Sequence, residues 1–163
     1  MIPRHKDKFW VTSKWLYIIK HGDDGSADKY KARFIARGFS QKEEVGYDEI
    51  FAPVARYTTI RFIIALTANQ GWSLHQMDIK TAFLHDFLKE EVYLEQPQGF
   101  EVQDRRTHIC KLKKYLYELK QSPRAWYERI DNYLMKLGFT RNDVDPNLYF
   151  NVEKDMPLIL VLY

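Results

Sequence analysis

Residues 10–38 read WVTSKWLYIIKHGDDGSADKYKARFIARG, and this stretch decides the fold class. Its first part, residues 10–20, is rich in Trp, Val, Tyr and Ile, which favour β-strands. Residues 21–25 form a Gly- and Asp-rich cluster typical of a turn. Apolar and basic residues then partly alternate over residues 29–37, as they do on a strand. The pattern predicts a β-hairpin that ends at Gly38.

The second arm of this hairpin carries a row of basic side chains: Lys29, Lys31, Arg33 and Arg37. A strand places residues with this even spacing on one face. A row of cations on a projecting ribbon suits phosphate binding, and arginine adds bidentate geometry. The alternative is that the lysines only protect an edge strand from pairing with other chains.

The rest of the chain predicts two helices among short strands. We expect the first helix to begin at Pro53 and to end at Gly71. The buried face of this helix is expected to contain Ile60, Ile63, Ile64 and Thr67. Ser122 is expected to cap the second helix, with Pro123 as its first residue and Gly138 after its end. Strands are expected over 72–78, 92–94, 147–151 and 158–163. These elements predict an α+β fold: a mostly antiparallel sheet with helices packed on one face.

Composition excludes several classes of protein. The chain has 163 residues, 45% of them hydrophobic, which argues against a disordered polypeptide. Cys110 is the only cysteine, so no internal disulfide can form. The longest apolar run, residues 158–163, is far shorter than the ~20 residues of a membrane-spanning helix, and no secretory signal is expected. Residues 43–104 carry a net negative charge and both flanking regions a net positive one, a layout that could place phosphate-binding surfaces beside a carboxylate-bearing middle. The alternative is ordinary solvated charge that happens to cluster.

Asp78 is the strongest candidate for chemistry. It follows an expected strand, and a carboxylate there is a suitable ligand for Mg²⁺. A two-metal phosphoryl-transfer site needs several such oxygens, so the alternative for a lone Asp is a turn or a helix cap. His75 and His108 have no partners at zinc-binding spacing. The sequence contains no glycine-rich phosphate loop.

Six ordered segments together resemble the copia-type LTR-retrotransposon reverse transcriptases. They are residues 31–41 (KARFIARGFSQ), 47–54 (YDEIFAPV), 76–84 (QMDIKTAFL), 92–100 (VYLEQPQGF), 119–127 (LKQSPRAWY) and 145–149 (DPNLY). The resemblance implies a right-hand polymerase of which this chain is the fingers and the first part of the palm. Residues 1–163 would be a partial reverse transcriptase domain, with a fingers hairpin at about 10–38 and fingers and palm over 53–163.

The resemblance also implies roles for individual residues. Asp78 would be the first of three catalytic carboxylates that bind Mg²⁺. Arg33 would grip the incoming triphosphate, Phe83 would be the aromatic gate against a ribose 2′-OH, and Tyr117 would line the nucleotide pocket. The implied partners are an RNA or RNA–DNA hybrid template–primer and a dNTP, with no membrane, and the implied location is intracellular, in a cytoplasmic particle or the nucleus.

The departures from the family pattern shape the expected function. In the family the last strand leads into a Tyr-x-Asp-Asp turn. Here the expected strand 158–163 ends at Tyr163. The resemblance therefore implies a chain that is truncated before those aspartates and lacks the remaining palm, the thumb and RNase H. Asp86 and Glu118 stand where the family usually has Gly. We therefore expect a fragment of an RNA-directed DNA polymerase that is inactive alone, since one carboxylate cannot hold two divalent ions. The alternative is a non-catalytic nucleic-acid-binding remnant that uses the basic hairpin; a third possibility is that the apolar end makes the chain aggregate.

Overall fold

The computed structural model describes residues 1–5, 8–41, 51–84, 86–153 and 156–163. They belong to two compact units. Unit 1 comprises Met1–Ile50 and Thr81–Pro123, and unit 2 comprises Phe51–Lys80 and Arg124–Tyr163. The segment 76–84 is therefore divided between the units.

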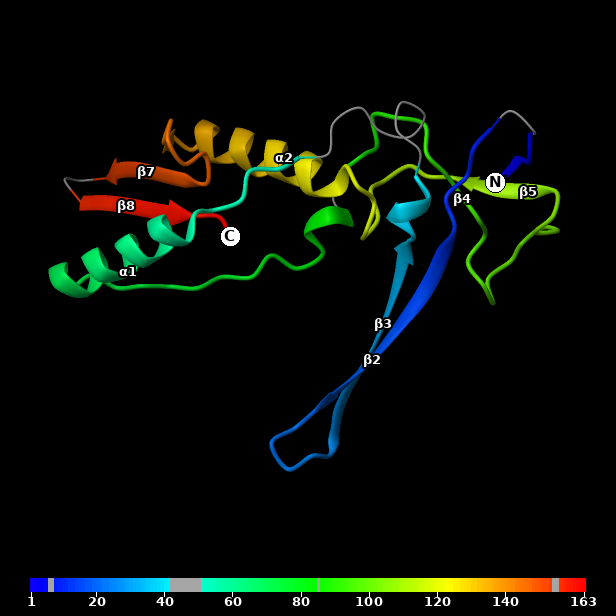
Figure 1. Cartoon of the computed structure of the whole chain (residues 1–163), viewed down its shortest axis with the longest axis horizontal. Helices are drawn as coiled ribbons and strands as arrows, with labels where there is room; N and C mark the ends of the chain where they lie inside the picture. Colours follow the sequence, from blue (N-terminus) through cyan, green and yellow to red (C-terminus); the bar gives the residue numbers. More distant parts are fainter. Residues whose placement is uncertain (6–7, 42–50, 85, 154–155) are drawn as a thin grey trace. The chain divides into compact units, whose positions relative to one another are not determined.

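A long antiparallel hairpin dominates unit 1 (Figure 1). Strand β2 (Ser13–His21) pairs with β3 (Ala27–Ala36), and the register places Trp15 opposite Phe34 and Lys20 opposite Lys29. In the turn, the Asp24 carboxylate accepts hydrogen bonds from the Ser26 hydroxyl (2.7 Å) and backbone N–H (3.0 Å). The predicted hairpin is confirmed.

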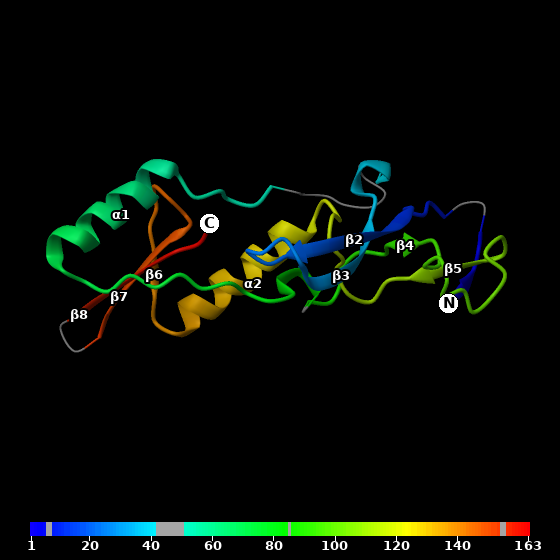
Figure 2. The ribbon, with the colours of Figure 1, turned by 90° about the horizontal axis from the view of Figure 1, so that it is seen from below.

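A small sheet lies at the base of the hairpin. Its strand order is β1 (Ile2–Pro3), β5 (His108–Lys111), β4 (Tyr93–Leu94), with antiparallel pairing throughout. A bridge between Val11 and Leu94 joins the chain entering β2 to this sheet. Figure 2 shows the start of β2 beside β4. Two short 3₁₀ helices, η1 (Gly38–Ser40) and η2 (Ala82–Leu84), complete the unit. The core beneath them contains Val11, Ala36, Val92, Leu94 and Leu119.

Unit 2 contains α1 (Tyr57–Gln70), most of α2 (Ser122–Lys136), and a sheet of order β6 (Thr140–Arg141), β7 (Leu148–Glu153), β8 (Met156–Val161). The strands pair antiparallel. Helix α2 packs on β7 and β8 through a core in which Leu134, Phe139 and Tyr149 are buried, with Ile130, Leu160 and Leu162 partly buried around them.

The predicted α+β class is confirmed in its mixed content of antiparallel sheets and two helices, but the expected single sheet is wrong. The described residues form three separate sheets. A strand over 72–78 is also wrong, because these residues are irregular and exposed. An extended segment forms a strand only when a neighbouring backbone pairs with it, and apolar alternation in Trp72, Leu74 and the following residues says nothing about that partner.

Helix α1 begins at Tyr57 instead of Pro53, and its expected buried face is only partly covered. Thr67 is buried, but Ile64 is 49% exposed. Gly71 ends the helix as predicted, with a left-handed φ of 65° and the Trp72 N–H bonded to the Thr67 carbonyl at 3.0 Å. Helix α2 includes Ser122 as its first residue, and the Ser122 hydroxyl donates to the Leu116 carbonyl (2.7 Å) instead of capping.

The start of α1 is held by a carboxylate from the loop before β7. Asp145 Oδ2 accepts hydrogen bonds from the Arg56 N–H (3.3 Å) and the Thr59 hydroxyl, while Oδ1 accepts from the Asn147 N–H (3.1 Å). Arg56, the N-cap residue, makes no side-chain cap of its own. Burial alone would raise the pKa of the Asp145 carboxyl, but the hydrogen bonds from Thr59, Asn147 and Arg56 together lower it below its ordinary value. A negative charge at a helix N-terminus also interacts favourably with the helix dipole.

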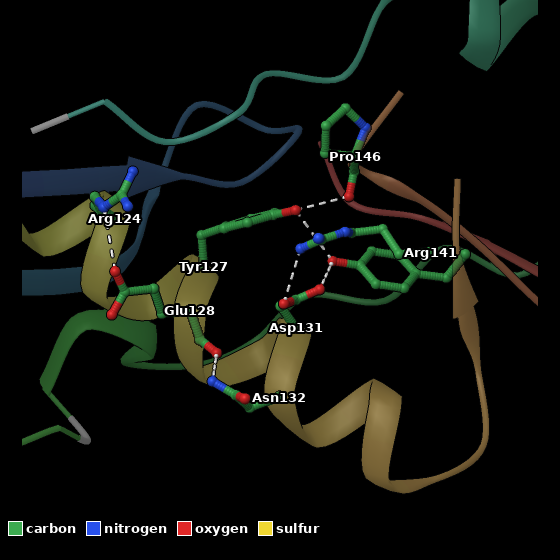
Figure 3. A network of polar contacts seen from close by, with 8 residues as sticks. Arg124, Tyr127, Glu128, Asp131, Asn132, Arg141 and Pro146 are labelled. Carbon is green, nitrogen blue, oxygen red and sulfur yellow. Dashed lines mark hydrogen bonds and ion pairs between the residues drawn. The ribbon is translucent and has the colours of Figure 1, made fainter. Parts of the chain in front are cut away.

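A second polar network fixes α2 to the sheet (Figure 3). The Tyr149 hydroxyl donates to Asp131 Oδ1 (2.8 Å), and Arg141 Nη1 bonds to Asp131 Oδ2 (3.0 Å). The Tyr127 hydroxyl donates to the Pro146 carbonyl at 2.8 Å. Burial, followed by the contacts with Tyr127 and Asp131, raises the pKa of Tyr149. The buried tyrosine hydroxyls therefore have partners, as buried polar groups require.

The Asp145 contacts yield a prediction about stability and pH. Replacing Asp145 with Asn is expected to lower the free energy of unfolding by about 1–2 kcal/mol near neutral pH, because the charged cap of α1 is lost. Since the folded-state pKa is depressed, the stabilisation is present above the ordinary pKa and is lost as the pH falls through the folded-state value. Urea denaturation from pH 7 down to pH 3 should show the difference between wild type and variant shrinking. Asp143→Asn, an exposed neighbour, is the control, and equal effects of both substitutions would contradict the assignment.

Candidate nucleotide and nucleic-acid site

The end of β3 is fixed to the loop that precedes α2 by a close backbone approach. The Ala36 N–H donates to the Tyr117 carbonyl at 3.1 Å. Two residues on, the Gly38 backbone lies so close to the Glu118 carbonyl that a Cβ at position 38 would overlap the oxygen. Only glycine allows this approach, so the contact between the hairpin and the loop depends on Gly38.

A buried glutamine reinforces the same junction. Gln41 is 5% exposed, and its side-chain amide donates to Gln121 Oε1 (3.0 Å) while its Oε1 accepts from the Lys120 N–H (2.8 Å). Both ends of the amide are therefore satisfied, which makes the geometry specific.

This junction brings together the three residues predicted to contact a nucleotide. The Arg33 guanidinium carbon lies 5.6 Å from the centroid of the Tyr117 ring. The Phe83 ring, from η2, meets Tyr117 edge-on, with centroids 5.5 Å apart and an interplanar angle of 88°. Arg33 is exposed, whereas Phe83 and Tyr117 are partly buried. Three segments far apart in sequence thus place a cation beside two aromatic rings.

The arrangement suits a ligand with a phosphate and an apolar face. A guanidinium over an aromatic ring is attracted to it, and its planar fork of N–H donors matches phosphate oxygens. The two perpendicular rings present an apolar surface beside Arg33. We therefore regard Arg33, Tyr117 and Phe83 as the candidate nucleotide site.

The predicted cation row is confirmed for three of its four members. Lys29, Lys31 and Arg33 alternate along β3 and share one face. Lys20 lies directly opposite Lys29, and like charges at such positions repel. The charge of Lys20, then partial burial and the charges of Lys29 and Arg33, lower the pKa of Lys31. This crowding of positive charge would be relieved by a bound anion.

The placement of Arg37 on that face is wrong. Strand β3 ends at Ala36, and Arg37 is the residue before η1. It lines a cavity with Trp15 and Phe34, which lie on the opposite face of the hairpin from Arg33. Because the strand stops one residue earlier, the alternation that predicted the position of Arg37 no longer applies.

Asp78 belongs to unit 2, in the irregular segment between α1 and η2, and is exposed. Across the described ranges, no three His, Cys, Asp or Glu side chains gather into a group able to hold a metal ion. A single carboxylate does not by itself fit a two-cation site. The metal-binding role of Asp78 remains a prediction.

Sequence reasoning missed the supports of the site. Gly38 and Gln41 lie within the segment 31–41, but nothing in that segment shows which loop they contact. The aromatic cluster of Trp15, Phe34 and Phe100 was also missed, although the spacing of Trp15 and Tyr17 on β2 already placed two rings on one face.

A family model described as reverse transcriptase (RNA-dependent DNA polymerase) matches residues 1–163, the whole chain. The chain belongs to this reverse transcriptase family. It is 42% identical over 164 residues to the "Retrovirus-related Pol polyprotein from transposon TNT 1-94" of Nicotiana tabacum, a match covering 100% of this chain and 12% of the relative. The corresponding protein from transposon RE1 of Arabidopsis thaliana is 41% identical over 139 residues, covering 85% of this chain and 10% of the relative.

A more distant relative is the "Transposon Ty1-BL Gag-Pol polyprotein" of Saccharomyces cerevisiae, which is 32% identical over 145 residues. This match covers 80% of this chain and 8% of the relative. The chain thus spans about a tenth of the length of the curated relatives that it matches. No solved structure gives a significant match. The predicted membership of the copia-type retrotransposon reverse transcriptases is confirmed.

Two further expectations from the sequence concern the segment 47–54 and membrane-spanning helices. The first half of the segment 47–54 lies outside the described residues, which resume at Phe51. Neither helix in the described ranges is long and apolar enough to cross a membrane.

Glu118 has a left-handed φ of 65°, at a position where glycine was expected from the family resemblance. Replacing Glu118 with Gly is expected to raise the free energy of unfolding by about 0.5–1 kcal/mol, because glycine adopts this conformation without steric cost. Glu118→Ala keeps the Cβ and should give no such gain.

Asp86→Gly is the matched control at the second position where the family resemblance suggested glycine. Asp86 is not among the non-glycine residues with positive φ, which in the described ranges are Thr81 and Glu118, and its carboxylate accepts the Phe87 N–H at 3.0 Å. Urea denaturation should show no stabilisation for this variant. Equal gains at both positions would refute the backbone explanation.

Proposed function

We propose that this chain supplies the incoming-nucleotide side of a retrotransposon reverse transcriptase, whose reaction is RNA-directed DNA polymerisation. The observation that carries the proposal is the convergence of Arg33, Tyr117 and Phe83 in unit 1. These residues come from three separate segments, and each had a nucleotide-contacting role implied by family resemblance.

Each residue has a distinct part in the proposal. Arg33 binds the triphosphate through its guanidinium donors. Phe83 limits the space beside the sugar and so disfavours a ribose 2′-OH. Tyr117 lies beside both, with its ring under the Arg33 guanidinium and perpendicular to the Phe83 ring, and keeps the cation and the gate at a fixed spacing.

Asp78 is proposed as a catalytic carboxylate and ligand of Mg²⁺, since reverse transcriptases generally use a divalent metal ion. The ion would align the primer 3′-hydroxyl and the dNTP α-phosphate. Because Asp78 is one exposed carboxylate, we expect the 163 residues by themselves to have no polymerase activity.

The wider assignment follows the same resemblance. We propose that residues 1–163 are part of a right-hand polymerase domain, with residues 10–38 as its fingers hairpin and residues 53–163 as fingers and palm. The proposed partners are an RNA or RNA–DNA hybrid template–primer and a dNTP. The second candidate is nucleic-acid binding without catalysis, favoured by the crowded cations Lys20, Lys29 and Lys31.

Primer extension tests the expected inactivity. With an RNA template, a DNA primer, dNTPs and Mg²⁺ or Mn²⁺, the purified 163-residue protein is expected to incorporate no nucleotide above background, and Asp78→Asn should be indistinguishable from it. Incorporation by the wild type that disappears in Asp78→Asn would contradict the inactivity and support the role of Asp78 at once.

Equilibrium binding to an RNA–DNA hybrid tests the basic face. Lys29→Ala and Lys31→Ala are each expected to weaken binding and to reduce the slope of log affinity against log salt by about 1, the loss of one phosphate contact. Lys136→Ala, at the end of α2 in unit 2, is the control and should change neither quantity. Binding by the wild type that does not vary with salt would sink this proposal.

A further inference from the structure

Lysine amines of unit 1 lie in two opposite electrostatic environments. Beside the small sheet, Lys8 Nζ bonds to Glu91 Oε2 at 3.0 Å, and Lys111 Nζ bonds to the other carboxylate oxygen of Glu91. Hydrogen bonds with this carboxylate raise the pKa of both lysines. On the hairpin, in contrast, the amine of Lys31 has cations as its charged neighbours.

The cations around Lys31 come from both strands of the hairpin. Lys29 and Arg33 flank it on the same face of β3, each about 7 Å away along the strand. Lys20 lies on β2, directly opposite Lys29. Among the residues that the structure describes, none of these four side chains forms an ion pair with a carboxylate. Lys31 therefore lies in a cluster of uncompensated positive charge.

Two properties follow from this cluster. The charge of Lys20, followed by partial burial and the charges of Lys29 and Arg33, lowers the pKa of Lys31, so more of this amine is neutral and nucleophilic than for the two lysines bound to Glu91. The same cations attract a small dianion, and the guanidinium offers paired N–H donors to phosphate oxygens. A nucleophile and phosphate-binding groups thus lie side by side.

We propose that Lys31 is a modification site that accepts the acyl group of an acyl phosphate. The Nζ lone pair attacks the carbonyl carbon, an amide N–C bond forms, and the C–O bond between the acyl group and the phosphate breaks. The phosphate leaves with the electron pair of that bond and takes up the proton that the amine loses. Arg33, Lys29 and Lys20 stabilise the negative charge that develops on the leaving phosphate.

Acylation of Lys31 changes the charge of the hairpin. It converts a cationic amine into a neutral amide and leaves Lys29 and Arg33 as the charged residues on that face of β3. For the proposed binding of nucleic acid, this amounts to the loss of one phosphate contact. That consequence rests on the proposed function, whereas the reaction at Lys31 does not.

Mass spectrometry of the 163-residue protein after incubation with acetyl phosphate tests the site, since initial acetylation rates can be compared between the lysines of one molecule. Lys31 is expected to react about fivefold faster than Lys8 and Lys111, whose amines are kept protonated by Glu91. Equal rates at the three lysines would overturn the proposal.

Substitutions of neighbouring lysines test whether the cation cluster causes the reactivity. Lys20→Gln and Lys29→Gln are each expected to slow acetylation of Lys31 about twofold or more, because each removes a charge that acts on its amine. Lys14→Gln is the matched control: Lys14 lies on the same strand as Lys20 but is not among the charges that lower the pKa of Lys31. This variant should keep the wild-type rate, and equal effects of Lys14→Gln and Lys20→Gln would contradict the assignment.

A neutral reagent, the N-hydroxysuccinimide ester of acetic acid, tests the recognition of phosphate. The ratio of the rate at Lys31 to the rate at Lys8 is expected to be about threefold smaller with the ester than with acetyl phosphate, because the ester has no phosphate to bind the cations. An equal ratio with both reagents would overturn an acyl phosphate as the donor. None of these measurements contains nucleic acid, so a failure of the proposed function is seen only in the hybrid-binding experiment.

Discussion

The candidate site depends on a contact between two stretches of backbone. Gly38 lies against the Glu118 carbonyl with no room for a Cβ, and the Ala36 N–H is bonded one residue earlier in the loop, to Tyr117. A side chain at position 38 would separate β3 from the loop and move Arg33 away from Tyr117. The buried amide of Gln41 completes the junction through Gln121 and the Lys120 N–H. The geometry of the candidate nucleotide site is therefore a consequence of backbone packing several residues away from it.

Unit 2 is held together by a different kind of interaction. Its first helix is anchored by the Asp145 carboxylate, while the buried core joins α2 to β7 and β8. Apolar side chains on α1 and in the following segment, such as Phe62 and Met77, stay largely exposed. A carboxylate that binds the start of a helix fixes where the helix begins without burying much surface area. This explains how α1 is held in place while much of its apolar surface remains in solvent.

The hairpin divides two chemistries between its faces because side chains alternate along a strand. Lys29, Lys31 and Arg33 lie on one face, and Trp15, Tyr17 and Phe34 on the other. One ribbon can thus present charge for phosphates toward one side and flat rings toward the other.

Local sequence determined the hairpin, the helix ends near Gly71 and Gly138, and the location of two strands. The strands expected over 92–94 and 158–163 are found at Tyr93–Leu94 and Met156–Val161. Turn chemistry, helix capping and the alternation of side chains are properties of neighbouring residues. The ordered motifs also determined the family and named Arg33, Tyr117 and Phe83. Only the tertiary structure decided that these three meet, that Arg37 leaves the cation row, that residues 72–78 lack a strand partner, and that Asp145 caps α1. Each of these depends on pairing or contact between segments that are distant in the chain. Neither the periodicity of apolar residues nor the secondary-structure propensity of a segment shows which distant segment will be its neighbour.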